Sequence, residues 1–524
     1  MRFLGGFKKD RRLLIVLSSV LLLVAVSYPI VLFAQKTHLL ISLDKEAQGT
    51  PVGLQLPGRQ SPLQLPEQSG MATPKGQKGA QQPVTSGPPS GPSTPGSPTL
   101  DRLEQVTDQA FGDGTTYVPN SWGQHKNRII RTSTGDIFTV FISEGTHLHR
   151  TWHLMHRSPN GGWQEIKTGD AGEEPINIVR GPNDEIHIIA FPGTQGQVEH
   201  FESTDLGKTW TSEMLPGQWS TDQGYIGADV NAQGDIVVVQ TGNDIPGTLY
   251  WCYYSPASGK WQFHTTDFPI RYTYNFAFPD ANNGITIVGM RDALRNELGY
   301  PDAGGGFDYI FNQIKYFYIS NANSSNPTVT QQAVVAQQEP QSNTDADITY
   351  MTDSYMDTLG RVHILYFDLY DNLVHHVILK NGDVIKEVKL NIDYGDKARV
   401  FQDALGHFYI ISTSQDGNSL NIYPGTASDT DGTLLNPPVS LNISQLPGCS
   451  DYDFCHSPNL TIQRSGHALS NYIDGVYGNH TKRSTSASNY ANRSILKRNE
   501  ISENNPTIRP TGGLLDYFLK FHFS

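Results

Sequence analysis

Histidines gather at two places in this sequence, and an imidazole can bind a metal ion or move a proton. One run covers His147 to His153 and reads HLHRTWH, and the other is the pair His375-His376. Because alternate residues of a β-strand point to the same face, His147, His149 and Thr151 would share one side of a strand. The first run therefore fits a metal site or a proton-abstracting base. A solvated strand is the ordinary alternative, and we expect no bound metal.

Two loops resemble cofactor-binding motifs but lack residues that the chemistry needs. The glycines 304–306 are not followed by the Lys-Ser/Thr pair of a phosphate-binding loop. The segment 429–432, Asp-Thr-Asp-Gly, begins like a calcium loop, yet no Glu follows at the required distance. We therefore expect no cofactor.

Residues 203–210 read Ser-Thr-Asp-Leu-Gly-Lys-Thr-Trp and match the pattern S-x-D-x-G-x-T-W at every specified position. In such a hairpin turn the Asp accepts hydrogen bonds from backbone amides, the Gly takes a positive φ, and the Trp packs against neighbouring strands. Degenerate copies end at Trp163 and Trp261, so the tryptophans recur about every fifty residues, a spacing typical of propeller blades. The structural residues of the complete copy are Ser203, Asp205, Gly207, Thr209 and Trp210.

This motif resembles the Asp-box, the bacterial neuraminidase (BNR) repeat of the sialidase-like β-propellers. The resemblance implies an all-β propeller in which the box lies on the blade periphery, away from the active site. It therefore concerns the architecture and not the chemistry.

A second repeat predicts the number of blades. A polar turn leads into a short apolar strand seven times, at 135–141, 184–190, 234–239, 284–288, 360–366, 406–411 and 466–472. Apolar segments such as 176–179 and 398–401 precede most copies, which indicates a hairpin of two inner strands. We expect a seven-bladed β-propeller over residues 100–524, with six blades as the alternative because the seventh copy is the weakest. Residues 514–523 alternate like a strand, and we expect them to close the ring.

The resemblance also implies a site for an acidic sugar. Sialidases carry an x-R-I-P motif on an early inner strand, and its Arg joins two others to bind the substrate carboxylate. Residues 127–130 read Asn-Arg-Ile-Ile, so Arg128 matches and Ile130 replaces the proline. Arg291 and Arg399 are the expected partners of Arg128, and Arg271 also lies near an inner strand.

A sialidase further needs an activated Tyr nucleophile with a Glu, and an Asp as acid. Tyr272, Glu174 and Asp347 occupy suitable positions, with Tyr274 as another tyrosine. Other propellers with this repeat are polysaccharide lyases that act on uronate polymers. We expect recognition of a glycan or other surface ligand over the central channel. The alternative is a glycan-active enzyme, either an exo-sialidase-type glycoside hydrolase or a lyase, for which the histidine runs are candidates.

The N-terminal part of the chain differs in composition. Five basic residues lie within residues 1–12, and an uncharged apolar stretch follows at 13–33. This pattern predicts a single transmembrane signal anchor with a cytoplasmic N-terminus and an extracytoplasmic body. A cleaved signal peptide, which would give a secreted protein, is the alternative. Residues 34–99 are rich in Pro, Gly, Ser and Gln and predict a disordered linker.

Charge and cysteine content limit the partners. The chain carries a net charge of -13, and because residues 1–12 carry +4, the remainder carries -17. This acidity argues against nucleic-acid binding, and we expect a monomeric propeller. Cys449 and Cys455 bracket a short loop that predicts a disulfide, whereas Cys252 lies in an aromatic run and is expected to be a buried strand residue. Between 291 and 345 the repeat spacing lengthens, which indicates either a lid-like loop or an inert insertion.

Overall fold

The computed structural model describes residues 95–110, 124–143, 149–172, 176–192, 196–221, 225–242, 247–303, 308–392, 398–414, 419–443, 459–460, 470, 472–478 and 514–523. All of them belong to the second of two compact units of the chain, Thr85–Ser524. The predicted anchor at 13–33, nearly all of the linker, and the Cys449–Cys455 loop lie outside these ranges. Within the described ranges, no helix is long and apolar enough to cross a membrane.

The regular secondary structure of the described residues is almost entirely β-strand and comprises seven four-stranded antiparallel sheets and one two-stranded sheet. The first three sheets along the chain are β2 (Ile129–Arg131), β3 (Ile137–Ile142), β4 (Arg150–Arg157) and β5 (Trp163–Ala171); β6 (Asn177–Arg180), β7 (Ile186–Ala190), β8 (Glu199–Ser203) and β9 (Thr211–Met214); and β10 (Gly227–Val230), β11 (Ile236–Thr241), β12 (Thr248–Ser255) and β13 (Lys260–Asp267).

The next three sheets repeat this order. They are β14 (Tyr272–Pro279), β15 (Ile285–Arg291), β18 (Gln313–Ser320) and β19 (Thr328–Gln337); β20 (Thr349–Met356), β21 (Val362–Asp368), β22 (Leu373–Lys380) and β23 (Asp383–Leu390); and β24 (Arg399–Gln402), β25 (Phe408–Thr413), β26 (Ser419–Pro424) and β27 (Val439–Asn442). Between β15 and β18 the chain adds a small two-stranded sheet with a 3-10 turn, namely β16 (Ala293–Leu294), η1 (Arg295–Leu298) and β17 (Tyr309–Ile310).

The last sheet joins the two ends of the folded unit. It consists of β28 (Asn459–Leu460), β29 (Tyr472–Gly478), β30 (Leu514–Phe523) and β1 (Pro98–Ala110). The C-terminal strand β30 pairs antiparallel with both β29 and the N-terminal strand β1, with Leu103 opposite Leu519. The prediction of a closing strand at 514–523 is therefore confirmed. Its outer partner β1 begins at Pro98, two residues before the predicted boundary.

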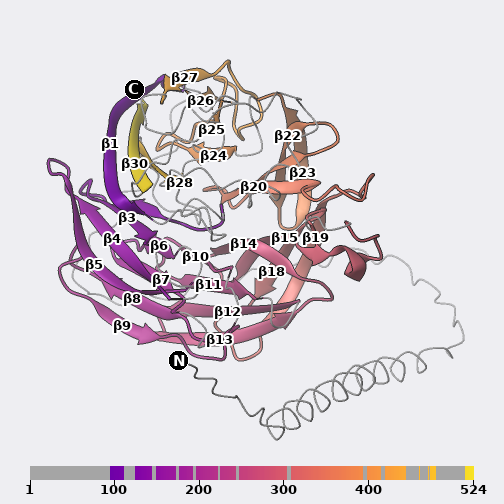
Figure 1. Cartoon of the computed structure of the whole chain (residues 1–524), viewed down its shortest axis with the longest axis horizontal. Coiled ribbons are helices and arrows are strands. Elements are labelled where there is room, and N and C mark those ends of the chain that lie inside the picture. Colours follow the sequence, from indigo (N-terminus) through magenta and orange to yellow (C-terminus); the bar gives the residue numbers. More distant parts are fainter. Residues whose placement is uncertain are drawn as a thin grey trace, which may run out of the picture. The chain divides into compact units, whose positions relative to one another are not determined.

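The sheets follow one another around a ring, as Figure 1 shows. The first strand of each sheet contacts that of the next in the series β2, β6, β10 and β14, and again between β20 and β24. The last sheet contacts the sixth through β1 and β27, and the first through β28, β29 and β2. This closed order of radial sheets is a β-propeller, so the all-β prediction is confirmed.

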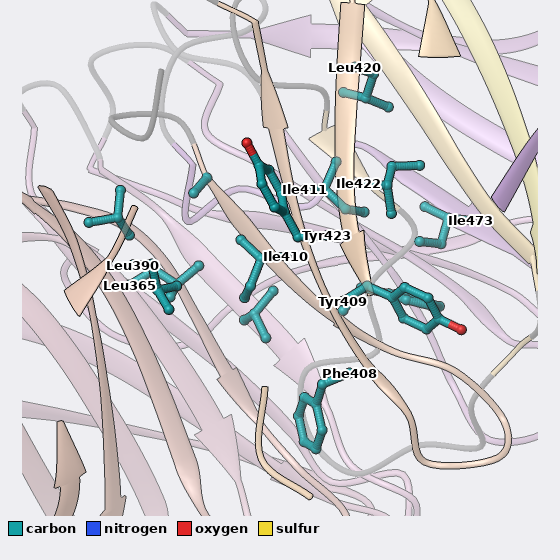
Figure 2. Packing of buried hydrophobic residues seen from close by; sticks show 14 of the residues in the cluster. Leu365, Leu390, Phe408, Tyr409, Ile410, Ile411, Leu420, Ile422, Tyr423 and Ile473 are labelled. Atoms are coloured by element: carbon teal, nitrogen blue, oxygen red, sulfur yellow. The ribbon is translucent and has the colours of Figure 1, made fainter. Parts of the chain in front are cut away.

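The turn-strand repeats become the second strands of the sheets. Six copies form β3, β7, β11, β15, β21 and β25. The seventh copy, 466–472, lies almost wholly outside the described residues. These strands read as continuous apolar runs because both of their faces pack against neighbouring sheets. In β25, Phe408, Tyr409, Ile410 and Ile411 are all buried, and Figure 2 shows them with Ile422 of the adjoining strand.

The outermost strands have a different pattern, because one face meets solvent. In β19, exposed and half-buried residues alternate along the strand. Trp163, Trp210 and Trp261 belong to the hairpins that lead into the outermost strands. Cys252 lies in β12 and is fully buried, as predicted.

Residues 203–210 form a hydrogen-bonded turn between β8 and β9. Asp205 accepts from the Thr209 backbone N–H at 2.8 Å and from its hydroxyl at 2.7 Å. These bonds lower the pKa of Asp205 to about 2. Gly207 has a φ of +81°, and Ser203 Oγ accepts from its N–H at 2.8 Å. Trp210 is only half-buried and donates from its indole N–H to the Gly207 carbonyl at 3.0 Å.

Candidate functional site

The most distinctive group of side chains lies at the face where the first strands begin and the second strands end. Arg271 directly precedes β14, and Asp292 directly follows β15. Because these strands pair antiparallel, with Tyr272 opposite Arg291, their ends meet. Arg271 donates from Nη2 to Asp292 Oδ2 at 2.9 Å and from Nε to the Asp292 carbonyl at 3.1 Å. The two side chains form a buried ion pair.

Aromatic rings surround this pair. The Tyr309 ring centroid lies 4.9 Å from Arg271 Cζ, and the Tyr225 centroid lies 6.0 Å from it. Tyr225 contacts Tyr274 edge to face at 5.1 Å, and Tyr274 contacts Phe311 at 5.9 Å. We call these residues the Arg271 cluster: Arg271, Asp292, Tyr225, Tyr274, Tyr309 and Phe311.

The edges of the cluster reach other parts of the ring. His125, ahead of β2, lies 5.5 Å from Tyr274 between ring centroids, and Tyr350 of β20 lies 6.0 Å from Phe311. Tyr225, Tyr274 and Phe311 are buried, whereas Tyr309 and Tyr350 are half-buried. A ligand arriving at this face would therefore meet the half-buried rings first.

Tyr274 has an unusual backbone. Its φ is +52°, and the β14–β15 pairing shifts register between Thr273 and Phe276. A positive φ is uncommon for a bulky residue and costs on the order of 1–3 kcal/mol, so such residues persist where the surrounding structure holds them, often at functional sites. The bulge re-aims the Tyr274 side chain. This local strain marks the cluster as a candidate site.

The electrostatics of Asp292 are also unusual. Burial raises the pKa of Asp292 to about 6, although the neighbouring Arg271 and a hydrogen bond from Thr273 favour the charged form. The nearby carboxylate of Asp347 raises it further. Among the described residues, Asp292 Oδ1 has no hydrogen-bond partner. The cluster thus combines an acceptor, an ion pair and aromatic rings.

The segment between β15 and β18 contributes side chains to the cluster. Its strand β17 contains Tyr309, whose ring lies against Arg271, and Phe311 is the first residue after β17. The Phe311 N–H donates to the Ala346 carbonyl at 2.8 Å, which ties the segment to the approach of β20. Whether the segment acts as a lid stays a prediction.

The predicted arginines lie at this face but point to partners within the chain. Arg399 is buried, and its Nη1 donates to the Gln124 carbonyl at 3.0 Å and to Asp353 Oδ1 at 3.2 Å. Arg291 is half-buried and donates from Nε and Nη2 to Asn312 Oδ1 at 2.9 and 2.7 Å.

Arg128 is 1% exposed and lies just ahead of β2. Its backbone carbonyl accepts from the Val140 N–H at 3.0 Å and from the Thr139 hydroxyl at 2.9 Å. Arg291 and Arg399 thus donate to different acceptors of the chain. The role of all three arginines as ligand residues stays a prediction.

The predicted catalytic residues are only partly described by the structure. Tyr272 is buried, its hydroxyl donates to Gln313 Oε1 at 2.5 Å, and its ring packs against Phe317 at 5.3 Å. Burial raises the pKa of Tyr272, which disfavours the phenolate that a nucleophile needs. Asp347 is half-buried beside the Arg271 cluster. Glu174 lies outside the described residues.

The histidine runs do not form one group. His149 is exposed, and His147 lies outside the described residues. His153 is buried, stacks on Phe141 at 4.6 Å, and bonds to Glu165 at 2.6 Å. His375 bonds to Asp371 and Glu387, each at 2.9 Å. The contacts with Phe141, Glu165 and Glu387 join neighbouring strands of one sheet, whereas Asp371 lies in the turn before β22.

Asp368, Asp371 and His375 are the one set among the described residues whose ligand atoms lie close enough to share a metal ion. However, Lys389 Nζ already lies 2.7 Å from Asp371 Oδ2, and Gln338 donates to Asp368 at 3.0 Å. An ammonium in that position opposes a second cation. The arrangement is adequately explained as a strand-turn ion pair.

Comparison with protein-family models found no match, and comparison with curated proteins found none. Among solved structures, the polysaccharide lyase Uly1 is similar at 12% identity over 81% of this chain and 99% of its own, with a TM-score of 0.48. An ulvan lyase of family PL25 is 11% identical over 65% of this chain and 86% of its own, with a TM-score of 0.41. The six-bladed fucose-binding lectin of Aleuria aurantia is 10% identical over 62% of this chain and 98% of its own, with a TM-score of 0.36. At such identities and TM-scores the likeness says nothing about chemistry, and the fold rests on this chain's own strand pairing.

Proposed function

We propose that this protein is a glycan-recognition propeller and that the Arg271 cluster is its binding site. The observation that carries the proposal is the set of aromatic rings around one buried ion pair at the face where the first strands begin. Carbohydrate sites combine ring faces, which cover the C–H surface of a sugar, with a few fixed polar groups for its hydroxyls. The strained backbone of Tyr274 supports a functional reason for this arrangement.

The experiment is equilibrium binding of the full chain to a glycan array, with a matched aromatic control. Tyr309→Ala removes a half-buried ring of the cluster and should weaken binding at least about tenfold, since truncating an anchoring aromatic residue costs more than about 1 kcal/mol. Tyr254→Ala removes a half-buried ring of β12 outside the cluster and should leave binding unchanged. Equal effects of the two changes, or no bound glycan, would refute the proposal.

A glycan-active enzyme is the second candidate, and Asp292 favours it. Its pKa of about 6 would keep part of the carboxyl protonated near neutral pH, with the Asp347 carboxylate nearby. Most glycoside hydrolases use two carboxyl groups whose different environments give them different pKa values. Release of nitrophenol from a panel of nitrophenyl glycosides, absent in Asp292→Asn, would support this candidate over pure recognition.

We further propose that each of the seven four-stranded sheets is one blade and that the segment 203–210 is an Asp-box of the sialidase-like type. The proposed body is tethered outside the cell by a transmembrane segment at 13–33 and a linker at 34–99. The basic N-terminal flank and the composition of the linker support this topology. Protease digestion of the body on intact cells tests it, and complete protection would refute it.

A further inference from the structure

The Arg271 cluster also bears on the class of glycan that binds, and this inference rests on the function proposed above. We propose that the ligand is an uncharged saccharide, and that Asp292 excludes acidic saccharides by occupying the guanidinium that a ligand carboxylate would need. This differs from the expectation of an arginine clamp for an acidic sugar.

The first step concerns Arg271 itself. A carboxylate is recognised best by the planar fork of an arginine, through two parallel N–H donors. In this chain, Nε and Nη2 of Arg271 already donate to the carbonyl and the Oδ2 of Asp292. Tyr309 covers a face of the guanidinium at 4.9 Å. An acidic ligand would have to displace Asp292 and leave a buried carboxylate uncompensated, which is costly.

The second step concerns the other arginines at this face. Arg399 donates to Asp353, and Arg291 donates to Asn312 with both Nε and Nη2. Each is thus directed to an acceptor of the chain. The half-buried carboxylate of Asp347 lies close enough to act on Asp292, and it would repel an acidic ligand as well. Arg271, Arg291 and Arg399 therefore all donate to acceptors within the chain, and Asp347 adds a negative charge beside them.

The third step concerns what the cluster offers a neutral sugar. Asp292 Oδ1 is a fully buried acceptor without a donor among the described residues, so a sugar hydroxyl supplies that donor only when a covering side chain moves aside. Tyr309 and Tyr350 are half-buried, so part of each ring faces solvent. Such rings can stack on the C–H face of a pyranose. Hydroxyl groups and ring faces together match an uncharged saccharide.

The test uses glycans in matched acidic and neutral forms. The full chain, purified in detergent, is assayed against immobilised polygalacturonate, hyaluronan and sialyllactose, and against carboxyl-reduced polygalacturonate, carboxyl-reduced hyaluronan and lactose. We expect binding to neutral members and none to their acidic partners. Tighter binding to an acidic member would overturn the inference while leaving glycan recognition intact. If no glycan of either kind binds, the proposed function itself fails.

A variant tests the part played by Asp292. Asp292→Asn keeps the side-chain size and removes the negative charge that neutralises Arg271, although the backbone carbonyl of residue 292 still accepts from Nε. Affinity for the acidic member should therefore rise at least about tenfold, as expected when a ligand carboxylate can pair with the uncompensated guanidinium. Asp474→Asn is the matched control, because Asp474 is a buried partner of Arg131 at 2.5 Å, outside the cluster. It should give no gain.

A folded Asp292→Asn protein with no gain, or an equal gain in the control, would contradict the role of Asp292. If thermal melting shows that Asp292→Asn does not fold, the comparison of acidic and neutral members on the natural chain decides the inference alone.

Discussion

Asp292 is the residue on which the proposed site depends, and its surroundings set its response to pH. Its pKa of about 6 results from burial, which outweighs the stabilising contact with Arg271. In an unfolded chain an Asp has a pKa of about 3.9. The folded state therefore binds this proton more tightly than the unfolded state at pH values between the two.

It follows that this group makes the free energy of unfolding fall as pH rises from about 4 to about 6, by at most about 3 kcal/mol. Asp292→Asn should remove this part of the pH dependence. Chemical denaturation of both proteins at several pH values between 4 and 7 measures the difference. Parallel curves for the two proteins would show that Asp292 does not titrate in this range.

His187 responds in the opposite direction. Burial, with a contribution from the neighbouring His200, lowers the pKa of His187 to about 3. Because the unfolded chain takes up this proton at about 6.5, the neutral ring stabilises the fold above that pH, and this stability is lost as pH falls toward 3. His187→Phe, which keeps an aromatic ring against His200, should reduce the drop in melting temperature between pH 7.5 and pH 4.5. His149→Gln, at an exposed position, should not.

The site could be predicted from the sequence only in part. Arg271, Asp347 and Tyr274 attract attention by type and by nearness to inner strands. The pairing of Arg271 with Asp292 depends on the register of β14 and β15, and no local sequence pattern predicts that register. Tyr309 lies in a segment that breaks the repeat spacing, so the repeat does not predict its place in the site.

At the scale of elements, the sequence was most informative where burial leaves a strong pattern. The second strands are buried on both faces and read as apolar runs, which is why six of them were found. The strand β1 lies in a charged segment and has its large apolar residues Leu100, Leu103 and Val106 at intervals of three, so no period-two pattern predicts it. Its position is determined by pairing with β30, from the far end of the chain.

Removing β30 should therefore destabilise the fold more than an ordinary C-terminal truncation. A chain that ends before Leu514 loses the pairing with both β1 and β29 and leaves two sheet edges exposed. We expect aggregation or a much lower melting temperature. Light scattering and thermal melting measure this, and an unchanged melting temperature would show that the ring does not depend on β30.

The tryptophans differ in depth, and their truncation should differ accordingly. Trp152 of β4 is 0% exposed and contacts Phe201 of the next sheet at 5.2 Å. Trp152→Ala should lower the free energy of unfolding by about 3–5 kcal/mol. Trp210→Ala, at a half-buried position, should lower the free energy of unfolding by clearly less. Urea denaturation compares the two variants, and a larger loss of unfolding free energy for Trp210→Ala would make the turn at 203–210 the more important packing element.

At the scale of the whole molecule, the ring brings together side chains from sheets that are distant in sequence. His125 lies ahead of β2, Tyr225 ahead of β10 and Tyr350 within β20, yet all border the Arg271 cluster. This convergence is the reason that one face of the propeller can hold a site. It also explains why the site was less predictable than the blades.

The most direct test is a crystal structure of the protein with the tightest-binding glycan from the array. The account predicts density for the sugar against Tyr309 and Tyr350, with a hydroxyl within hydrogen-bonding distance of Asp292 Oδ1. A sugar bound instead on the outer hairpins, such as the turn at 203–210, would contradict the account.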